Sequence, residues 1–444
     1  MPFKVGMISL GCPKNLIDSE IMLGILKEKG FVITNLEKEA DVIIINTCSF
    51  IEDAKKESIE NILSAARLKG SGNCRALLVS GCLAQRYHRE LLTEVPEIDG
   101  LIGTGKIPDI AAAVEKTLQG EKVCVTGPPG YLHGPNNNRI LATPGYTAYL
   151  KIAEGCDNHC SYCIIPEIRG NYKSRSIEDV TVEAARLVRQ GAKELILVAQ
   201  DITRYGADIY GKPVLEKLLK KLLAIEGMIW IRLLYAYPSL IGDELIELLA
   251  RERRICRYLD MPVQHASDRL LRKMNRRGNK METVKLVEKL RSAVPGITLR
   301  TSLIVGFPGE SEDDFEELLE FMNEVKFDRV GVFAYSQEEG TPAAAMSDQV
   351  PDEVKLERRG RAMALQQEIS LEKNREKIGR IMTVLTERRS SGMRRSYAGR
   401  SEGDAPGIDG NVFFKSDLEL KPGDFVRVRI KKAQTYDLFG ELLK

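Results

Sequence analysis

The feature that most constrains this fold is a repeated alternation of short apolar strands with helices. Near the N-terminus, FKVGMISL, DVIIINTC and RALLVSGC are typical of buried strands, and DSEIMLGILKEKG is typical of a helix that Asp18 or Ser19 caps and Gly30 ends. Strands separated by helices run parallel, because each helix returns the chain to the same edge of the sheet. Residues 1–135 are therefore predicted to form a doubly wound α/β domain.

Each of these three strands is followed by a cysteine: Cys12, Cys48 and Cys82. The carboxyl ends of parallel strands share one edge of a sheet, so these cysteines should converge in space. Free cysteine is often only a small buried hydrophobic residue. Here each cysteine follows its strand and has glycine or polar neighbours, which favours a three-thiolate metal cluster. Three other cysteines lack this placement and are interpreted as structural: Cys74, Cys124 and Cys256.

A second run of alternating elements follows a Gly-, Pro- and Asn-rich segment at 127–147, which is predicted to be a linker. Six strands with intervening helices favour an open, partial TIM-type (β/α)6 barrel over residues 140–375. Functional side chains of such barrels lie at the carboxyl ends of strands. Polar residues occupy these predicted ends, and they are Gln200, Asp201, Tyr237, Gln264, His265, Arg300, Glu310, Tyr335 and Ser336. For His265, a local capping role and contact with a substrate or cofactor are equally open.

The C-terminal residues 377–444 follow a charged helix at 355–378 and change to a period of two, which predicts a small antiparallel β-barrel. This segment holds 14 Lys and Arg against 9 Asp and Glu. Its strand VRVRIKK places Arg427, Arg429 and Lys431 on one face, suited to RNA or an adaptor, although a solvated edge is the alternative. Because the segment has no cysteine or histidine, we expect that it can be removed without loss of metal.

The loop GCDNHCSYCIIP carries Cys156, Cys160 and Cys163 in the spacing C-x3-C-x2-C. A disulfide scaffold does not suit nine cysteines spread over 444 residues. Zinc needs four ligands, and His159 within the loop is the one nearby candidate for the fourth. The remaining interpretation is an iron–sulfur cube held by three thiolates, with one iron left open.

Composition adds exclusions. A net charge of +2 demands no nucleic-acid partner, and no apolar run approaches the roughly 20 residues of a membrane span. The N-terminus runs straight into a strand and lacks the apolar region of a signal peptide. We expect a cytoplasmic monomer in a reducing compartment, which suits exposed thiols.

The cysteine loop resembles that of the radical S-adenosylmethionine (SAM) enzymes, and the whole chain resembles their methylthiotransferase family. SLGCPKNLIDSE, NTCSFIEDAKKESIE, SGCLAQRY and YLKIAEGCDNHCSYCIIPEIRGNYKSR carry the resemblance. It implies a C-terminal TRAM domain and two 4Fe–4S clusters, an auxiliary one on Cys12, Cys48 and Cys82 and a radical-generating one on Cys156, Cys160 and Cys163. SAM is the expected second cofactor, and the residues predicted to contact it are Tyr162, Gln200, Asp201, Gln264, Arg300 and Glu310.

The family contains two main substrate classes, an aspartate of ribosomal protein S12 and an adenosine of tRNA. PKNLIDSE after the first cysteine, AQDITRYGADIYG, LDMPVQHAS and YSQEEGTPAA are similar to the ribosomal-protein class. The resemblance thus implies methylthiolation of the aspartate β-carbon, in or near the small ribosomal subunit, with an electron donor as further partner. A tRNA adenosine methylthiotransferase is the alternative enzyme. A metal-containing scaffold without chemistry is the third hypothesis.

Overall fold

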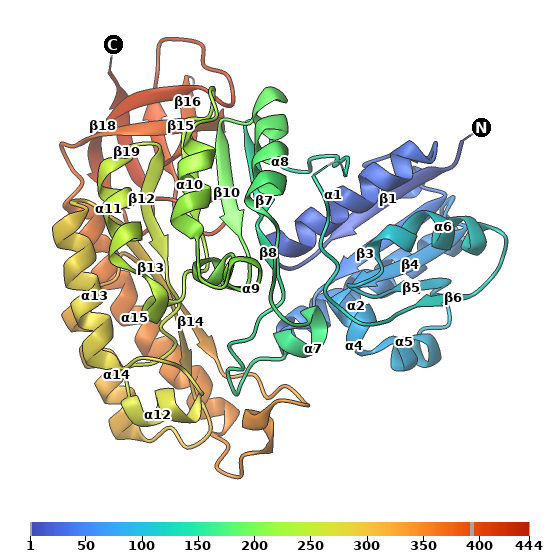
Figure 1. The fold of residues 1–444 in the computed structure, drawn as a ribbon, viewed down its shortest axis with the longest axis horizontal. Coiled ribbons are helices and arrows are strands. Elements are labelled where there is room, and N and C mark those ends of the chain that lie inside the picture. The colour runs from blue at the N-terminus through green and yellow to red at the C-terminus, as the bar shows by residue number, and fades with distance from the viewer. Residues whose placement is uncertain (1, 136, 391–394, 444) are drawn as a thin grey trace.

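The computed structural model describes residues 2–135, 137–390 and 395–443 and contains three domains (Figure 1). In Figure 1 the N-terminal domain, in blue, stands beside a central domain coloured green to orange, and the C-terminal barrel, in red, covers one end of the central sheet. One apolar cluster joins all three domains, since it runs from Ile17 through Tyr149 and Trp230 to Leu385. No helix of the described chain is long and apolar enough to cross a membrane.

The N-terminal domain is a parallel six-stranded sheet with a doubly wound order, as predicted. In spatial order its strands are β2 (Val32–Ile33), β1 (Lys4–Ser9), β3 (Val42–Thr47), β4 (Ala76–Gly81), β5 (Gly100–Ile102) and β6 (Val123–Val125). Its helices are α1 (Pro13–Glu28), α2 (Glu52–Ala66), α3 (Leu68–Ser71), α4 (Cys82–Arg86), α5 (His88–Glu94) and α6 (Ile110–Leu118), with short 3-10 turns at Glu37–Glu39 and Ile107–Asp109. The order of the strands reverses between β1 and β3, and ligands of such sheets bind at this point.

Helix α1 begins earlier than the sequence pattern predicted. Cys12 is its N-cap residue and Pro13 occupies the first turn, where proline's fixed φ suits a helix start and its missing N–H costs nothing. Asp18 and Ser19 therefore cap nothing and lie buried inside the helix. The predicted end is confirmed, because Lys29 is the C-cap and Gly30 follows with a left-handed φ of 89°.

The central domain is an open, fully parallel sheet of six strands, which confirms the partial-barrel prediction. In spatial order its strands are β14 (Arg329–Ala334), β13 (Thr298–Val305), β12 (Ile255–Asp260), β11 (Trp230–Leu233), β10 (Glu194–Val198) and β7 (Thr147–Lys151). A small hairpin pairs β8 (Ala153–Glu154) with β9 (Lys173–Ser174).

Helices surround this sheet. They are α7 (Ile165–Arg169), α8 (Ile177–Arg189), α9 (Ala207–Tyr210), α10 (Leu215–Leu223), α11 (Asp243–Arg251), α12 (Asp268–Lys273), α13 (Lys280–Ala293), α14 (Glu312–Val325) and α15 (Asp352–Arg375), with 3-10 turns at Ile202–Arg204, Pro238–Leu240 and Pro342–Ala345. The charged helix predicted at 355–378 is α15, shifted three residues toward the N-terminus.

The C-terminal domain is a closed five-stranded barrel in the order β15-β16-β17-β19-β18. Its strands are β15 (Ile381–Arg389), β16 (Ser396–Ser401), β17 (Val412–Lys415), β18 (Phe425–Ala433) and β19 (Leu438–Leu442). Four neighbouring pairs are antiparallel, whereas β17 and β19 pair in parallel. An odd number of strands in a closed ring cannot alternate direction throughout, so one parallel pair is unavoidable.

The barrel is joined to the amino-terminal ends of the central strands by buried charges. Glu194, fully buried at the start of β10, accepts hydrogen bonds from Arg232 at 2.9 Å and from Arg400 of the barrel at 2.6 Å. Burial alone would raise the pKa of Glu194, but Arg400 and Arg232 outweigh it and lower the pKa to about 2. A further pair joins Arg329 to Asp404 at 3.0 Å. Removing the barrel would leave buried charges of the central domain without their partners, which costs stability. That the clusters are retained without the barrel stays a prediction.

We therefore expect Arg400→Met to lower the free energy of unfolding by about 3–5 kcal/mol, because it leaves Glu194 buried without one of its cations. Chemical denaturation measures the change. The matched control is Arg389→Met, whose side chain is 69% exposed in its pair with Glu419, and such surface pairs contribute about 1 kcal/mol or less. Equal effects of the two substitutions would show that the buried pair does not hold the domains together.

Candidate active site between the two sheets

A cavity of about 360 Å³ lies between the N-terminal and central domains, where the carboxyl ends of strands from both sheets meet. All six cysteines singled out by sequence line it. The sequence predicted two separate triads, and the structure brings both to a single cavity. Its volume falls within the range of small-molecule sites.

The first triad follows β1, β3 and β4, three adjacent strands of the N-terminal sheet. Two glycines make room for it. Gly11 has φ 81°, and a Cβ there would lie 2.7 Å from the Cys48 Cβ and 3.1 Å from its Sγ. Gly81 has φ 91°, and a Cβ there would lie 2.6 Å from the Thr47 carbonyl oxygen. The glycine before Cys12 and the glycine before Cys82 are thus required by both backbone angle and space.

The second triad lies in the loop between β8 and α7. The Cys156 N–H donates to the Gly170 carbonyl, and the Cys163 N–H donates to the Cys160 carbonyl, both at 3.0 Å. His159, with a left-handed φ of 49°, is exposed, and its carbonyl accepts a 2.8 Å hydrogen bond from Asn275. His159 is not among the residues that line the cavity, so the zinc alternative loses its fourth ligand.

The donor chemistry fits iron–sulfur clusters. All nine cysteines are free thiols, and no three Cys, His, Asp or Glu of the described chain converge closely enough to hold a single metal ion. Cluster thiolates bind separate irons of a cube, so their sulfurs stand farther apart than the ligands of one ion. Cations accompany both triads, with Arg169 Nη2 3.5 Å from the Cys82 sulfur and Arg276 Nη1 3.9 Å from that of Cys160.

Burial and nearby charges shift the pKa values of the individual thiols in different directions. Burial raises the pKa of Cys48 and of Cys163 to about 12 each. At Cys12 burial acts in the same direction, but Lys14 and Arg169 outweigh it and leave the pKa below the ordinary value of 9.0. Binding of metal by such protonated thiols releases protons, so loading is coupled to pH.

Of the predicted SAM contacts, Tyr162, Gln200, Asp201 and Gln264 line the cavity. Gln264 does so with φ 76°, and Tyr235, another lining residue, has φ 66°. Left-handed conformations are costly for residues other than glycine and cluster at functional sites. These four side chains remain predicted cofactor contacts.

The structure does not bring Arg300 and Glu310 to the cavity lining, and their contact with the cofactor stays an untested prediction. Arg300 is the third residue of β13, not at its carboxyl end, and pairs with Asp260 at 2.8 Å. Glu310 accepts the Gly306 N–H at 2.7 Å and pairs with Arg358 at 2.9 Å, which shapes the turn after β13. His265 is also absent from the lining, and its Nδ1 accepts the Ser267 N–H at 3.0 Å, in keeping with the local role.

The lining residues that sequence reasoning missed include three cations and one tyrosine: Lys14, Arg169, Arg276 and Tyr235. Lys14 and Arg169 stood inside quoted motifs, CPKN and EIRG, but nothing in their spacing distinguishes a cavity cation from an exposed one. Arg276 lies more than a hundred residues from Cys160, so only the fold reveals its position. Of the other cysteines, Cys74 and Cys256 are buried and Cys124 is exposed, and none lines the cavity.

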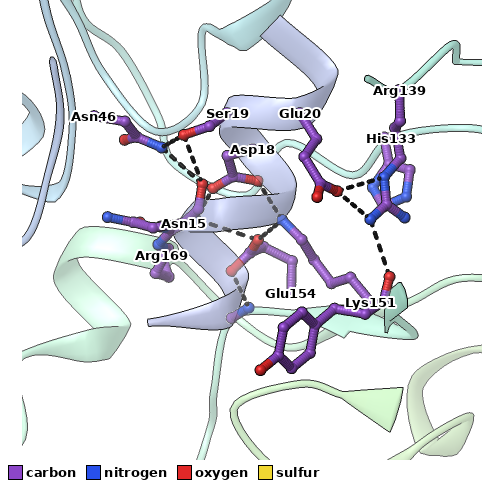
Figure 2. Close-up of polar contacts among 12 residues, drawn as sticks. Asn15, Asp18, Ser19, Glu20, Asn46, His133, Arg139, Lys151, Glu154 and Arg169 are labelled. Carbon is purple, nitrogen blue, oxygen red and sulfur yellow. Dashed lines mark hydrogen bonds and ion pairs between the residues drawn. The ribbon is translucent and has the colours of Figure 1, made fainter. Parts of the chain in front are cut away.

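Figure 2 shows polar contacts that join the N-terminal domain to the central domain. Asp18 of α1 pairs with Arg169 at 2.6 Å and with Lys151, whose ammonium also pairs with Glu154 at 2.7 Å. Cys12 is the N-cap residue of α1, and Asp18 lies within the same helix. One helix therefore carries both a cysteine of the first triad and a charge that binds the helix to the central domain. Breaking such buried pairs costs several kcal/mol, which keeps the two triads at a fixed separation.

The predicted linker takes part in the same interface. Arg139 joins Glu20 of α1 to Glu183 of α8, and His133 lies 3.1 Å from Glu183 and 2.9 Å from Arg175. Both linker side chains are about 99% buried. The segment therefore connects the two domains in sequence and also holds them together through buried ion pairs.

Burial lowers the pKa of His133 to about 4, although the hydrogen bond to Glu183 opposes the shift. The unfolded chain then binds a proton more tightly than the folded one, so stability is complete above about pH 6.5 and falls as pH drops toward 4. We expect this residue to lower the free energy of unfolding by about 2 kcal/mol between pH 7 and pH 5. Urea unfolding at both values should show a smaller decrease for His133→Gln than for wild type, and equal decreases would contradict the assignment.

The fold and the site together define a class. Residues 150–322 match the radical SAM superfamily, residues 4–103 match the uncharacterized protein family UPF0004, and residues 378–443 match the TRAM domain. An open parallel sheet that presents a C-x3-C-x2-C loop at its carboxyl edge, within that match, is a radical SAM enzyme.

Relatives that match over the full length show which family of radical SAM enzymes the chain belongs to. The chain is 64% identical to the ribosomal protein uS12 methylthiotransferase RimO of Pelotomaculum thermopropionicum and 53% identical to that of Desulforamulus reducens, over 99% of each chain. The chain belongs to the RimO family of methylthiotransferases. The cofactors of this family are SAM and 4Fe–4S clusters, and the donor set described above fits them.

Solved structures show the same fold at low identity. The radical SAM methyltransferase TsrM of Kitasatospora setae, determined with cobalamin and a [4Fe-4S] cluster, aligns with a TM-score of 0.56 at 16% identity over 77% of each chain. OxsB, a cobalamin-dependent SAM radical enzyme, aligns with a TM-score of 0.51 at 12% identity over 82% of this chain and 56% of OxsB.

Proposed function

We propose that this protein attaches a methylthio group to the β-carbon of an aspartate in ribosomal protein uS12. The observation that carries the proposal is the meeting of both cysteine triads in one cavity, in a chain whose full-length relatives are named for this reaction. An aspartate β-carbon bears an unactivated C–H bond that acid–base chemistry does not open at useful rates. A site that brings two cofactors to one carbon suits such a bond.

In this proposal Cys156, Cys160 and Cys163 hold the radical-generating cluster, and Cys12, Cys48 and Cys82 hold the auxiliary cluster. When bound, the cofactors supply a 5′-deoxyadenosyl radical that removes hydrogen, a sulfur source and a methyl donor. The protein's own part is positional. The ion pairs of α1 with Lys151 and Arg169 fix the distance between the triads.

Exclusion of water is the second task of the chain. Tyr162, Tyr235 and Tyr237 line the cavity with Phe50 and Ile165, and these side chains give it largely apolar walls. A dry cavity protects a carbon radical from quenching and favours reaction at one carbon.

The substrate assignment is tested by mass spectrometry of uS12 from cells that lack this enzyme. We expect the target aspartate without its methylthio group, and restoration by the wild-type gene. If uS12 stays modified while a tRNA adenosine loses a methylthio group, the tRNA alternative is correct.

We further propose that the C-terminal barrel contacts RNA of the small ribosomal subunit, which also implies a cytoplasmic location. Arg427, Arg429 and Lys431 are exposed while the intervening Val428 and Ile430 are buried, as the period of two predicted. Lys431 is partly satisfied by Glu441 at 3.3 Å. Such a stripe at the end opposite the cavity can bind phosphates without disturbing the chemistry.

Replacing all three stripe residues by glutamine should weaken binding to the small subunit and flatten its salt dependence, by up to about three units of the log–log slope. The control replaces Lys27, Lys29 and Lys38, three exposed lysines of the N-terminal domain, in the same way. If both variants lose the same affinity for the small subunit, the effect comes from net charge alone and not from the stripe.

A further inference from the structure

Lys14 is a buried cation that forms no ion pair with a carboxylate of the described chain. Its side chain enters the cavity from the first turn of α1, and the residue is only 8% exposed. Its ammonium lies over the Tyr235 ring, 3.5 Å from the centroid. Among the described residues it makes no hydrogen bond, and no carboxylate lies within the 4 Å of an ion pair. Burying an ammonium is costly unless something charged or polar completes its surroundings.

The other cations of the lining differ in this respect. Arg169 is paired with Asp18 at 2.6 Å. Arg276 donates to the Pro262 carbonyl and stacks 4.0 Å from the centroid of Tyr237. The one lining carboxylate in the described chain, Asp201, is itself occupied by Asn158 and Thr203 at 2.9 Å each. Apart from the nearby thiol of Cys12, whose pKa it lowers, Lys14 has no anionic side chain of the lining to pair with, so its ammonium can donate to a group that enters from outside.

We propose that Lys14 binds the side-chain carboxylate of the substrate aspartate and so selects aspartate over its neutral analogue asparagine. This inference rests on the proposed function and names a specificity residue for it. The carboxylate is bonded directly to the β-carbon, so anchoring it fixes the position of the reacting C–H bond. An unpaired carboxylate would not enter this largely apolar cavity without a large desolvation cost, and Lys14 offsets that cost.

The location favours the substrate over the cofactor as the source of the carboxylate. Lys14 follows Cys12 by two residues and belongs to the wall of the N-terminal triad, whereas the loop of Cys156, Cys160 and Cys163 forms the opposite, central-domain wall. Its ammonium touches Tyr235 of the central domain, so it marks the seam between the two walls. In the proposed reaction the β-carbon of the substrate aspartate must be reached from both cysteine triads, and the boundary between the two walls is where that is possible.

The test compares binding of uS12 and of uS12 with the target aspartate replaced by asparagine, to reconstituted wild-type enzyme, Lys14→Met and the exposed control Lys27→Met. Methionine keeps most of the length and apolar stem of lysine and removes only the charge. Wild type and the control should prefer the aspartate protein by about 10- to 100-fold, the range of a hydrogen-bonded charge. Lys14→Met should reduce that preference to near one, mainly by weakening binding of the aspartate protein.

Two further measurements on the same variants separate the other roles open to Lys14. Loss of iron or a changed spectrum of the clusters, with an unchanged preference for aspartate, would show that Lys14 only balances cluster charge and would overturn the inference. Weaker SAM binding without uS12, again with the preference intact, would assign Lys14 to the SAM carboxylate and overturn it as well. If wild type neither binds nor modifies uS12, the proposed function itself fails, and that result is distinct from both.

Discussion

Replacing Cys156, Cys160 and Cys163 together by alanine is expected to remove about half of the roughly eight irons of the reconstituted enzyme and all reductive cleavage of SAM. The three thiols line one wall of the cavity on a single loop between β8 and α7. Without them no cluster forms on the central domain, so no electron reaches SAM. Iron analysis and detection of 5′-deoxyadenosine under anaerobic reduction measure the two effects.

The matched control for this variant replaces the three cysteines outside the cavity, Cys74, Cys124 and Cys256, by alanine. It should keep all iron, because none of these thiols faces the site. A cavity triple variant that retains full iron and SAM cleavage would contradict the assignment of the radical cluster.

Replacing Cys12, Cys48 and Cys82 is expected to give the complementary result. About half of the iron should again be lost, but SAM cleavage should continue, since the loop of Cys156 is bonded within the central domain through Gly170 and not to the N-terminal triad. Sulfur insertion should fall below detection by mass spectrometry of uS12, because the auxiliary cluster is the proposed sulfur-supplying side of the cavity.

A folding defect would imitate part of this result, because Cys48 and Cys82 are buried. The single variant Cys12→Ala guards against it, since Cys12 is partly exposed and its loss leaves the apolar cluster around α1 intact. If a folded variant methylthiolates uS12 at the wild-type rate, the auxiliary cluster has no part in sulfur insertion.

The sequence was sufficient to predict features that depend only on the alternation of side chains along a strand or on the shared carboxyl edge of a parallel sheet. Strand-end positions of Cys12, Cys48 and Cys82 predicted their convergence because parallel strands end together. The alternation in VRVRIKK predicted the exposed stripe because side chains of a strand alternate faces.

What the sequence left undetermined depends on contacts between domains. Asp18 looked like a helix cap, but its carboxylate pairs with Lys151 and Arg169 of another domain. Arg300 looked like a strand-end ligand, yet it lies near the start of β13 and pairs with Asp260. Local patterns carry no information on which buried charge will meet which. For the same reason the sequence did not reveal that Arg400 of the barrel reaches Glu194 across the interface.

In our proposal, the single cavity with its two cysteine triads is where an aspartate of uS12 receives its methylthio group. The most direct measurement is anaerobic turnover of the reconstituted enzyme with SAM and a reductant, with uS12 and tRNA offered in the same reaction and both analysed by mass spectrometry. We expect a methylthio group on the uS12 aspartate and none on tRNA. Methylthiolated adenosine with unmodified uS12 would contradict it.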